Sequence, residues 1–172
     1  MATYSDLGVK KIINAAGTYT KYSGSLMSEE VLTAMEAASK QFVDIDELLI
    51  KTGEYIADLV GAESALITAG AAAGLTLSTA ACIAGNNKGI KRKLPLGENL
   101  KNEIIIQKSH RNPYDQAINT AGGRFVEIGN AIECFGWELE SAINEKTAAV
   151  FHFIQSDMFR SSLPLDEVIE IA

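Results

Sequence analysis

The first residues that could take part in chemistry form a run of small side chains between a predicted strand and a predicted helix. The run, TAGAAAG over residues 68–74, follows the strand-like segment 64–68. Small side chains let a ligand approach the backbone, and the free N–H groups of a helix's first turn bind anions. The run is therefore a candidate anion-binding site. The same residues would also permit tight helix–sheet packing, and the run matches neither the P-loop nor GxGxxG.

A histidine follows the next predicted strand. His110 comes shortly after residues 103–107, EIIIQ, whose three isoleucines indicate a strand covered on both faces. Ligands of open parallel sheets bind beyond the carboxyl ends of the strands, where an imidazole could stack on a flat ring, titrate or bind phosphate. A surface-loop histidine would look the same in the sequence. The second histidine, His152, falls in the strand-like segment 147–154, which predicts a satisfied core or sheet residue.

Polar and aromatic side chains near the N-terminus form a weaker candidate site. They lie in and just after residues 8–18, a stretch that on its own resembles a strand and a loop. Others follow His110. The candidate substrate contacts are Thr18, Tyr19, Tyr22, Arg111 and Tyr114.

The elements that must position these residues alternate along the chain. Apolar spacing and capping signals predict helices over 28–40, 46–60, 71–84, 112–121, 136–144 and 165–172, with Pro113 at the first position of the fourth. Runs rich in β-formers predict strands over 64–68, 103–107, 124–128 and 147–154, and polar residues 86–102 predict a loop. Such alternation is typical of βαβ units. The sequence thus predicts an α/β fold of three layers around a mostly parallel sheet.

The composition limits which kinds of partner and cellular setting the sequence predicts. The 172 residues carry 15 basic and 22 acidic side chains, a net charge of −7, which disfavours nucleic-acid binding. Cys82 and Cys134 form no CxxC or CxxH pair, so no metal site is predicted and a reducing, cytoplasmic setting fits best. Cys82, in an Ala-rich helical stretch, is expected in the core. Residues 64–87 lack charge but are too rich in Ala, Gly, Thr and Ser to predict a membrane span.

Taken together and in order, these features resemble a known enzyme family. The chain is similar to the pyridoxal-phosphate enzymes related to bacterial selenocysteine synthase, the L-seryl-tRNA(Sec) selenium transferase group, and most of all to its D-glucosaminate-6-phosphate ammonia-lyases. The resemblance covers nearly the whole chain. It is carried by GVKKIINAAGT (8–18), GSLMSEEVLTAM (24–35), FVDIDELLIKTGEYIADLVGAESALITAGAAAGL (42–75), KNEIIIQKSHRNPYDQAI (101–118) and SLPLDEVIEIA (162–172).

The resemblance implies a fold and a cofactor. It implies part of the large domain of fold type I over residues 24–172, preceded by an N-terminal segment, 1–23. The turn at Gly70, Ala71 and Ala72 would bind the phosphate of pyridoxal 5′-phosphate, and His110 would stack on its pyridine ring. A homodimer or higher homo-oligomer is implied as well.

The resemblance also implies that part of the machinery lies elsewhere. In the family, the Schiff-base lysine and the aspartate that pairs with the pyridine nitrogen lie beyond the position matching Ala172. No catalytic residue is therefore assigned in this chain. Residues 151–164 differ from the family pattern and receive no assignment.

Three functional hypotheses remain open. The first is the N-terminal part of a lyase that eliminates and releases ammonia from a small amino acid or amino sugar acid, such as D-glucosaminate 6-phosphate. The second is a truncated, non-catalytic remnant, because the lysine is missing. The third, a selenium transferase acting on seryl-tRNA, is disfavoured by the acidic charge and by the lack of an extra N-terminal tRNA-binding region.

Overall fold

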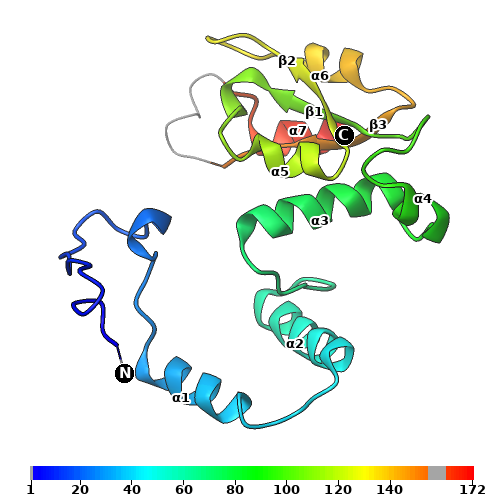
Figure 1. Cartoon of the computed structure of the whole chain (residues 1–172). Coiled ribbons are helices and arrows are strands. Elements are labelled where there is room, and N and C mark those ends of the chain that lie inside the picture. The colour runs from blue at the N-terminus through cyan, green and yellow to red at the C-terminus, as the bar shows by residue number, and fades with distance from the viewer. Residues whose placement is uncertain (1, 155–161) are drawn as a thin grey trace. The chain divides into compact units, whose positions relative to one another are not determined.

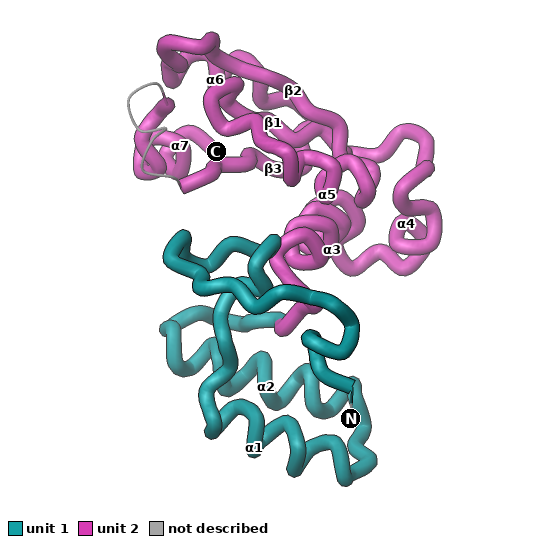
Figure 2. The backbone as a smooth tube through the Cα atoms, turned by 60° about the vertical axis from the view of Figure 1, so that its left-hand side comes forward, with its two compact units in different colours: residues 1–66 teal, residues 67–172 magenta. Residues whose placement is uncertain are grey.

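The computed structural model describes residues 2–154 and 162–172. Its chain divides into two compact units, Met1–Leu66 and Ile67–Ala172 (Figure 2). The expected division after residue 23 stays a prediction. No helix in the described part of the chain is long and apolar enough to cross a membrane.

The first unit is helical. A short 3₁₀ turn, Thr20–Tyr22, precedes α1 (Glu29–Ala38) and α2 (Ile45–Val60). Asp44 caps α2, because its carboxylate accepts the N–H of Glu47 at 3.0 Å. Gly61 ends the same helix with φ 70°, a left-handed conformation that favours glycine. Both predicted helices are confirmed.

One glycine in α2 shows how this unit packs. A Cβ on Gly53 would lie 2.3 Å from the backbone oxygen of Ala65. The helix therefore lies directly against the segment that precedes residue 67, and any larger residue at this position would force the two apart.

The second unit is built on a parallel sheet. Its strands are β1 (Glu103–Gln107), β2 (Arg124–Ile128) and β3 (Thr147–Phe151), in the order β2-β1-β3 (Figure 1). Ile105 of β1 pairs with Val126 on one side and Val150 on the other. The predicted α/β class with a parallel sheet is confirmed.

Helices cover both faces of this sheet. They are α3 (Ala71–Ala84), α5 (Asp115–Thr120), α6 (Gly136–Ala142) and α7 (Leu165–Ile171), while α4 (Lys88–Lys93) packs against α3. On one face Ile105 packs with Leu139 of α6 and Val168 of α7. Neighbouring side chains of a strand point to opposite faces, so Ile104 and Ile106 point to the side on which α5 and α3 pack. The three predicted layers are therefore present in this unit.

Two predicted elements were wrong. Residues 64–68 form no strand, because a strand needs a hydrogen-bonded neighbour and none of the described strands pairs with them. Residues 86–102 are not one loop. The Asn87 side chain accepts the N–H groups of Gly89 at 2.9 Å and Ile90 at 3.1 Å, and this cap begins α4.

Two other elements are shorter than predicted. Helix α5 begins at Asp115, so Pro113 precedes the helix rather than opening it. An Asx turn intervenes, in which the Asn112 side chain accepts the Tyr114 N–H at 2.9 Å. Strand β3 ends at Phe151, and His152 therefore lies just past the strand instead of inside it.

The cysteines differ in their surroundings. Cys82 is exposed, which corrects the expectation of a core residue, while Thr79 and Ile83 of the same helix are buried. Helix α3 is made mostly of small and apolar residues, so the sequence alone could not show which face packs. Cys134 is half-buried, and burial raises the pKa of its thiol to about 11. It is therefore a poor nucleophile near neutral pH.

Candidate functional site

The turn that opens α3 has the conformation that the small residues predicted. Gly70 is the N-cap with φ 140° and ψ 176°, a region open essentially to glycine alone. The Thr68 hydroxyl donates to the Gly70 carbonyl at 3.0 Å. The Gly74 N–H donates to the same carbonyl at 3.0 Å and is the first backbone bond of the helix.

This start leaves backbone donors free. The N–H groups of Ala71, Ala72 and Ala73 precede that first bond, and in the described residues no side chain caps the helix. No atom lies within 4 Å of the place where a Cβ of Gly70 would stand. Free donors, a positive helix end and open space together suit a phosphate.

A cavity begins beside this turn. Its volume is about 530 Å³, and α3, α5 and the end of β3 enclose it. Ala71 and Gly74 line one side, and the rings of Phe151 and Phe153 line another. Polar side chains at its edge come from the segment after His110: Asn112, Tyr114 and Asp115. The structure thus brings the α3 turn and the segment after β1 to one cavity at the carboxyl end of the sheet.

His110 lies in a 3₁₀ turn, Lys108–His110, directly after β1. It is fully buried, which excludes the surface-loop alternative. Its Nδ1 accepts the backbone N–H of Phe153 at 3.2 Å, and its ring packs edge-on against His152 with centroids 4.5 Å apart. Its buried Nε2 has no partner among the described residues.

The surroundings keep both rings neutral. Burial, and secondly the neighbouring His152, lower the pKa of His110 to about 4. Burial also lowers the pKa of His152. A fully buried ring offers no open face to a ligand, so the stack of His110 on a cofactor ring stays a prediction.

Arg111, a candidate substrate contact, is already engaged. Its Nε donates to Asp115 at 2.5 Å, a second nitrogen pairs with Glu127, and its guanidinium lies 4.4 Å from the ring centre of Phe125. Hydrogen bonding to Asp115 is the main cause that raises the pKa of Arg111. Arg111 therefore ties the turn after β1 to α5 and β2, and its contact with a substrate stays a prediction.

The N-terminal candidates lie in the other unit. Thr18 and Tyr19 are exposed beside the 3₁₀ turn that contains Tyr22. The side chain of Asn14 orders this stretch by donating to the Gly17 carbonyl at 2.8 Å. Their roles as substrate contacts stay predictions.

Sequence analysis missed Gln107. This last residue of β1 is buried, its Oε1 accepts the Leu163 N–H at 2.7 Å, and its Nε2 lies 3.5 Å from Nδ1 of His152. A polar residue that ends a run of three isoleucines was the available signal. Only the contacts with Leu163 and His152 show its use.

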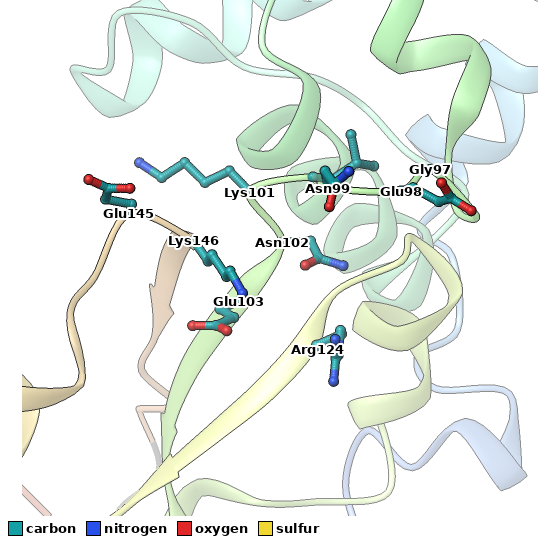
Figure 3. Close-up of a pocket in the computed structure, with 10 residues that line it drawn as sticks. Gly97, Glu98, Asn99, Lys101, Asn102, Glu103, Arg124, Glu145 and Lys146 are labelled. Atoms are coloured by element: carbon teal, nitrogen blue, oxygen red, sulfur yellow. The ribbon is translucent and has the colours of Figure 1, made fainter.

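A second hollow, of about 600 Å³, lies at the opposite edge of the sheet (Figure 3). It is lined by Glu103 and Arg124, the first residues of β1 and β2, and by Lys101 and Lys146. Parallel sheets bind their ligands at the carboxyl ends of strands, so this amino-edge hollow is not the predicted site. No described group of three or more His, Cys, Asp or Glu side chains could hold a metal ion.

Known proteins of similar sequence and structure show to which enzymes the chain is related. The chain is 37% identical, over 98% of its length, to D-glucosaminate-6-phosphate ammonia lyase of Salmonella typhimurium. A solved structure of D-glucosaminate-6-phosphate ammonia-lyase matches 98% of the chain with a TM-score of 0.90 and 36% identity. The chain is a homologue of this ammonia-lyase. The resemblance predicted from sequence is confirmed.

Other relatives catalyse different reactions. A 5′-C-glycyluridine monooxygenase-decarboxylase of Streptomyces is 34% identical, and an L-seryl-tRNA(Sec) selenium transferase of Alkaliphilus metalliredigens is 26% identical, each over 98% of the chain. No family model matches. The chain spans 47%, 44% and 37% of the lengths of the three relatives, so half or more of each relative has no counterpart in it.

Proposed function

We propose that this chain supplies the phosphate-binding part of a pyridoxal-phosphate-dependent lyase, which releases ammonia from a small amino acid or amino sugar acid such as D-glucosaminate 6-phosphate. The observation that carries the proposal is the uncapped start of α3, with free N–H groups and with open space at the Cβ position of Gly70. It occurs in a chain that is homologous to an ammonia-lyase over nearly its whole length.

The residues present fit the cofactor's phosphate. The N–H groups of Ala71 and Ala72 would donate to its oxygens, and the positive end of α3 would stabilise its charge. When bound, pyridoxal phosphate supplies an electron sink for bonds at the α-carbon of an amino substrate.

The other residues of the site shape its surroundings. Phe151 and Phe153 give the cavity an apolar side that limits water next to a bound ring. His110, neutral near pH 7, adds no positive charge to this end of the sheet. The lysine that moves the proton is expected, from the resemblance, outside this chain.

Binding of pyridoxamine 5′-phosphate tests the phosphate site. This analogue has no aldehyde, so it cannot react with surface lysines, and pyridoxamine serves as the matched ligand without phosphate. We expect calorimetry to show tighter binding of the phosphate ester, and Gly70→Ala to weaken it about tenfold or more, the worth of roughly one charge-assisted hydrogen bond.

Gly85→Ala is the control for that substitution. Gly85 ends the same helix, also has a positive φ of 49° and has open space around its Cβ position. It should leave affinity unchanged. Equal binding of the two ligands, or equal loss in both variants, would contradict a phosphate site at Gly70.

The lyase activity is tested in the full-length product of the gene. Ammonia release from D-glucosaminate 6-phosphate, dependent on added cofactor, is the expected result. A gene product that ends near Ala172 and releases no ammonia would instead support the non-catalytic remnant.

Partners and location are part of the same proposal. We expect a cytoplasmic homodimer or larger homo-oligomer acting on a small amino substrate. Sedimentation of the full-length protein checks the assembly. Binding of tRNA that weakens steeply with salt would favour the selenium-transferase alternative over the lyase.

A further inference from the structure

The carboxyl end of β1 meets the end of β3 in a polar cluster, formed by the buried Gln107 and His110 and the half-buried His152. Gln107 and His110 are at most 3% exposed. Two backbone N–H groups enter the cluster. That of Phe153 reaches His110 Nδ1 at 3.2 Å, and that of Leu163 reaches Gln107 Oε1 at 2.7 Å.

These backbone groups determine where the ring protons stand. A backbone N–H can only donate, so Nδ1 of His110 must be an unprotonated acceptor. In the neutral ring the proton is then on Nε2. Because the Leu163 N–H likewise needs an oxygen, the carboxamide of Gln107 cannot be flipped, and its NH₂ group faces His152.

The same reasoning extends to the second ring. An amide NH₂ can only donate, so the tautomer of His152 that pairs with it across 3.5 Å is the one with an unprotonated Nδ1. In that arrangement both rings have the same tautomer. They pack edge to face, at an angle of 86°, without a proton shared between them.

We propose that Gln107 is a positioning residue, which fixes the tautomer of His152 beside His110, whose own proton the Phe153 N–H confines to Nε2. If the proposed function is correct, the neutral ring adds no positive charge to that of the α3 N-terminus at the cofactor site. The unpartnered Nε2–H of His110 is then the donor left for an acceptor in the assembled site.

Other charges near the cluster are already accounted for. Lys108, in the same turn, is exposed. Arg111 is paired with Asp115 of α5 and Glu127 of β2. The neutral state of the two rings therefore depends chiefly on burial and on the donor that Gln107 presents.

The chain has two histidines, which makes a direct measurement possible. Long-range ¹H–¹⁵N correlation of the ring nitrogens, on the chain without cofactor, reports each tautomer. A His152→Phe variant assigns the signals. We expect protonated Nε2 and unprotonated Nδ1 in both rings near neutral pH. A proton on Nδ1 of either ring would overturn the proposal without any test of the variants.

Gln107→Glu tests the role of Gln107. A carboxylate retains an acceptor for the Leu163 N–H but replaces the donor that faces His152. We expect the proton of His152 to move to Nδ1, or its titration midpoint to rise by about one pH unit or more, as beside a new carboxylate. An unchanged His152 in a folded variant would overturn the proposal.

Gln116→Glu is the matched control. Gln116 is exposed on α5, so it introduces the same charge in the same unit outside the cluster. It should change neither tautomer. Since the cofactor takes no part in these spectra, their failure is distinct from failure of the proposed lyase function.

Discussion

Two places at the same end of the second unit differ in how they are built. The turn at Gly70 is made of backbone, has its donors free and faces open space. The cluster of Gln107, His110 and His152 is made of side chains, of which the first two are buried and His152 is half-buried, and most of its groups are paired. The first is therefore suited to bind an incoming anion, and the second to hold the fold around the site. Separate substitutions should affect binding and stability separately.

The largest stability effect is expected from His110→Ala. It removes a buried ring and leaves the Phe153 N–H without its acceptor, which should cost about 3 kcal/mol of unfolding free energy. Urea denaturation measures this loss. Affinity for pyridoxamine 5′-phosphate should persist in the folded fraction. Complete loss of binding with normal stability would mean that His110 serves binding rather than stability.

Acid should weaken the same cluster. The pKa of His110 falls from 6.5 to about 4 on folding. Between these values the unfolded chain binds more protons, so the protein loses stability as the pH is lowered. This pKa difference corresponds to about 3 kcal/mol of unfolding free energy, which is present above pH 6.5 and lost toward pH 4.

Denaturation of wild type and His110→Phe over this range isolates that contribution. The variant should lose less stability on acidification. Parallel pH curves for the two proteins would exclude His110 as the source.

Substitution in the turn at Gly70 should reduce binding more than stability, the reverse of the effect at His110. Gly70→Ala forces a side chain into a φ of 140°, which should cost about 1–2 kcal/mol, less than the loss at His110. Its loss of affinity for the phosphate ester should exceed that of His110→Ala. Thermal unfolding and calorimetry of the same samples compare the two effects. A Gly70→Ala protein that is less stable but binds the ester normally would contradict the assignment.

The smallest effect is expected from Arg111→Met. The lost contacts to Asp115, Glu127 and Phe125 are partly exposed, so they should be worth about 1 kcal/mol. Denaturation of this variant and of Glu127→Gln, singly and together, measures the coupling between the two side chains. Additive losses would mean that the pair contributes nothing to stability.

The same variant tests Arg111 as a substrate contact in the full-length enzyme. A change in KM for the amino sugar acid, without a change in the pKa of His110, would support direct contact. A change in both would indicate that Arg111 acts by placing the turn.

Local elements could be predicted closely from the sequence. The bounds of β1, β2 and α3 agree with the prediction, because three isoleucines, β-branched residues and flanking glycines determine them locally. The turn at Gly70 belongs to this group, since its donors come from the start of a helix. Errors arose where a partner decided the outcome, as for residues 64–68, which lack a described neighbouring strand.

By itself, the sequence determined the α/β alternation, the likeness to the ammonia-lyases and the phosphate-suited turn. These depend on residue type, spacing and backbone conformation within a few positions. Only the tertiary structure decided that His110 is buried, that Gln107 meets Leu163 and His152, and that Arg111 is paired with Glu127. Each of those results joins residues far apart in the chain. Burial and hydrogen-bond partners arise only when the sheet and its helices pack.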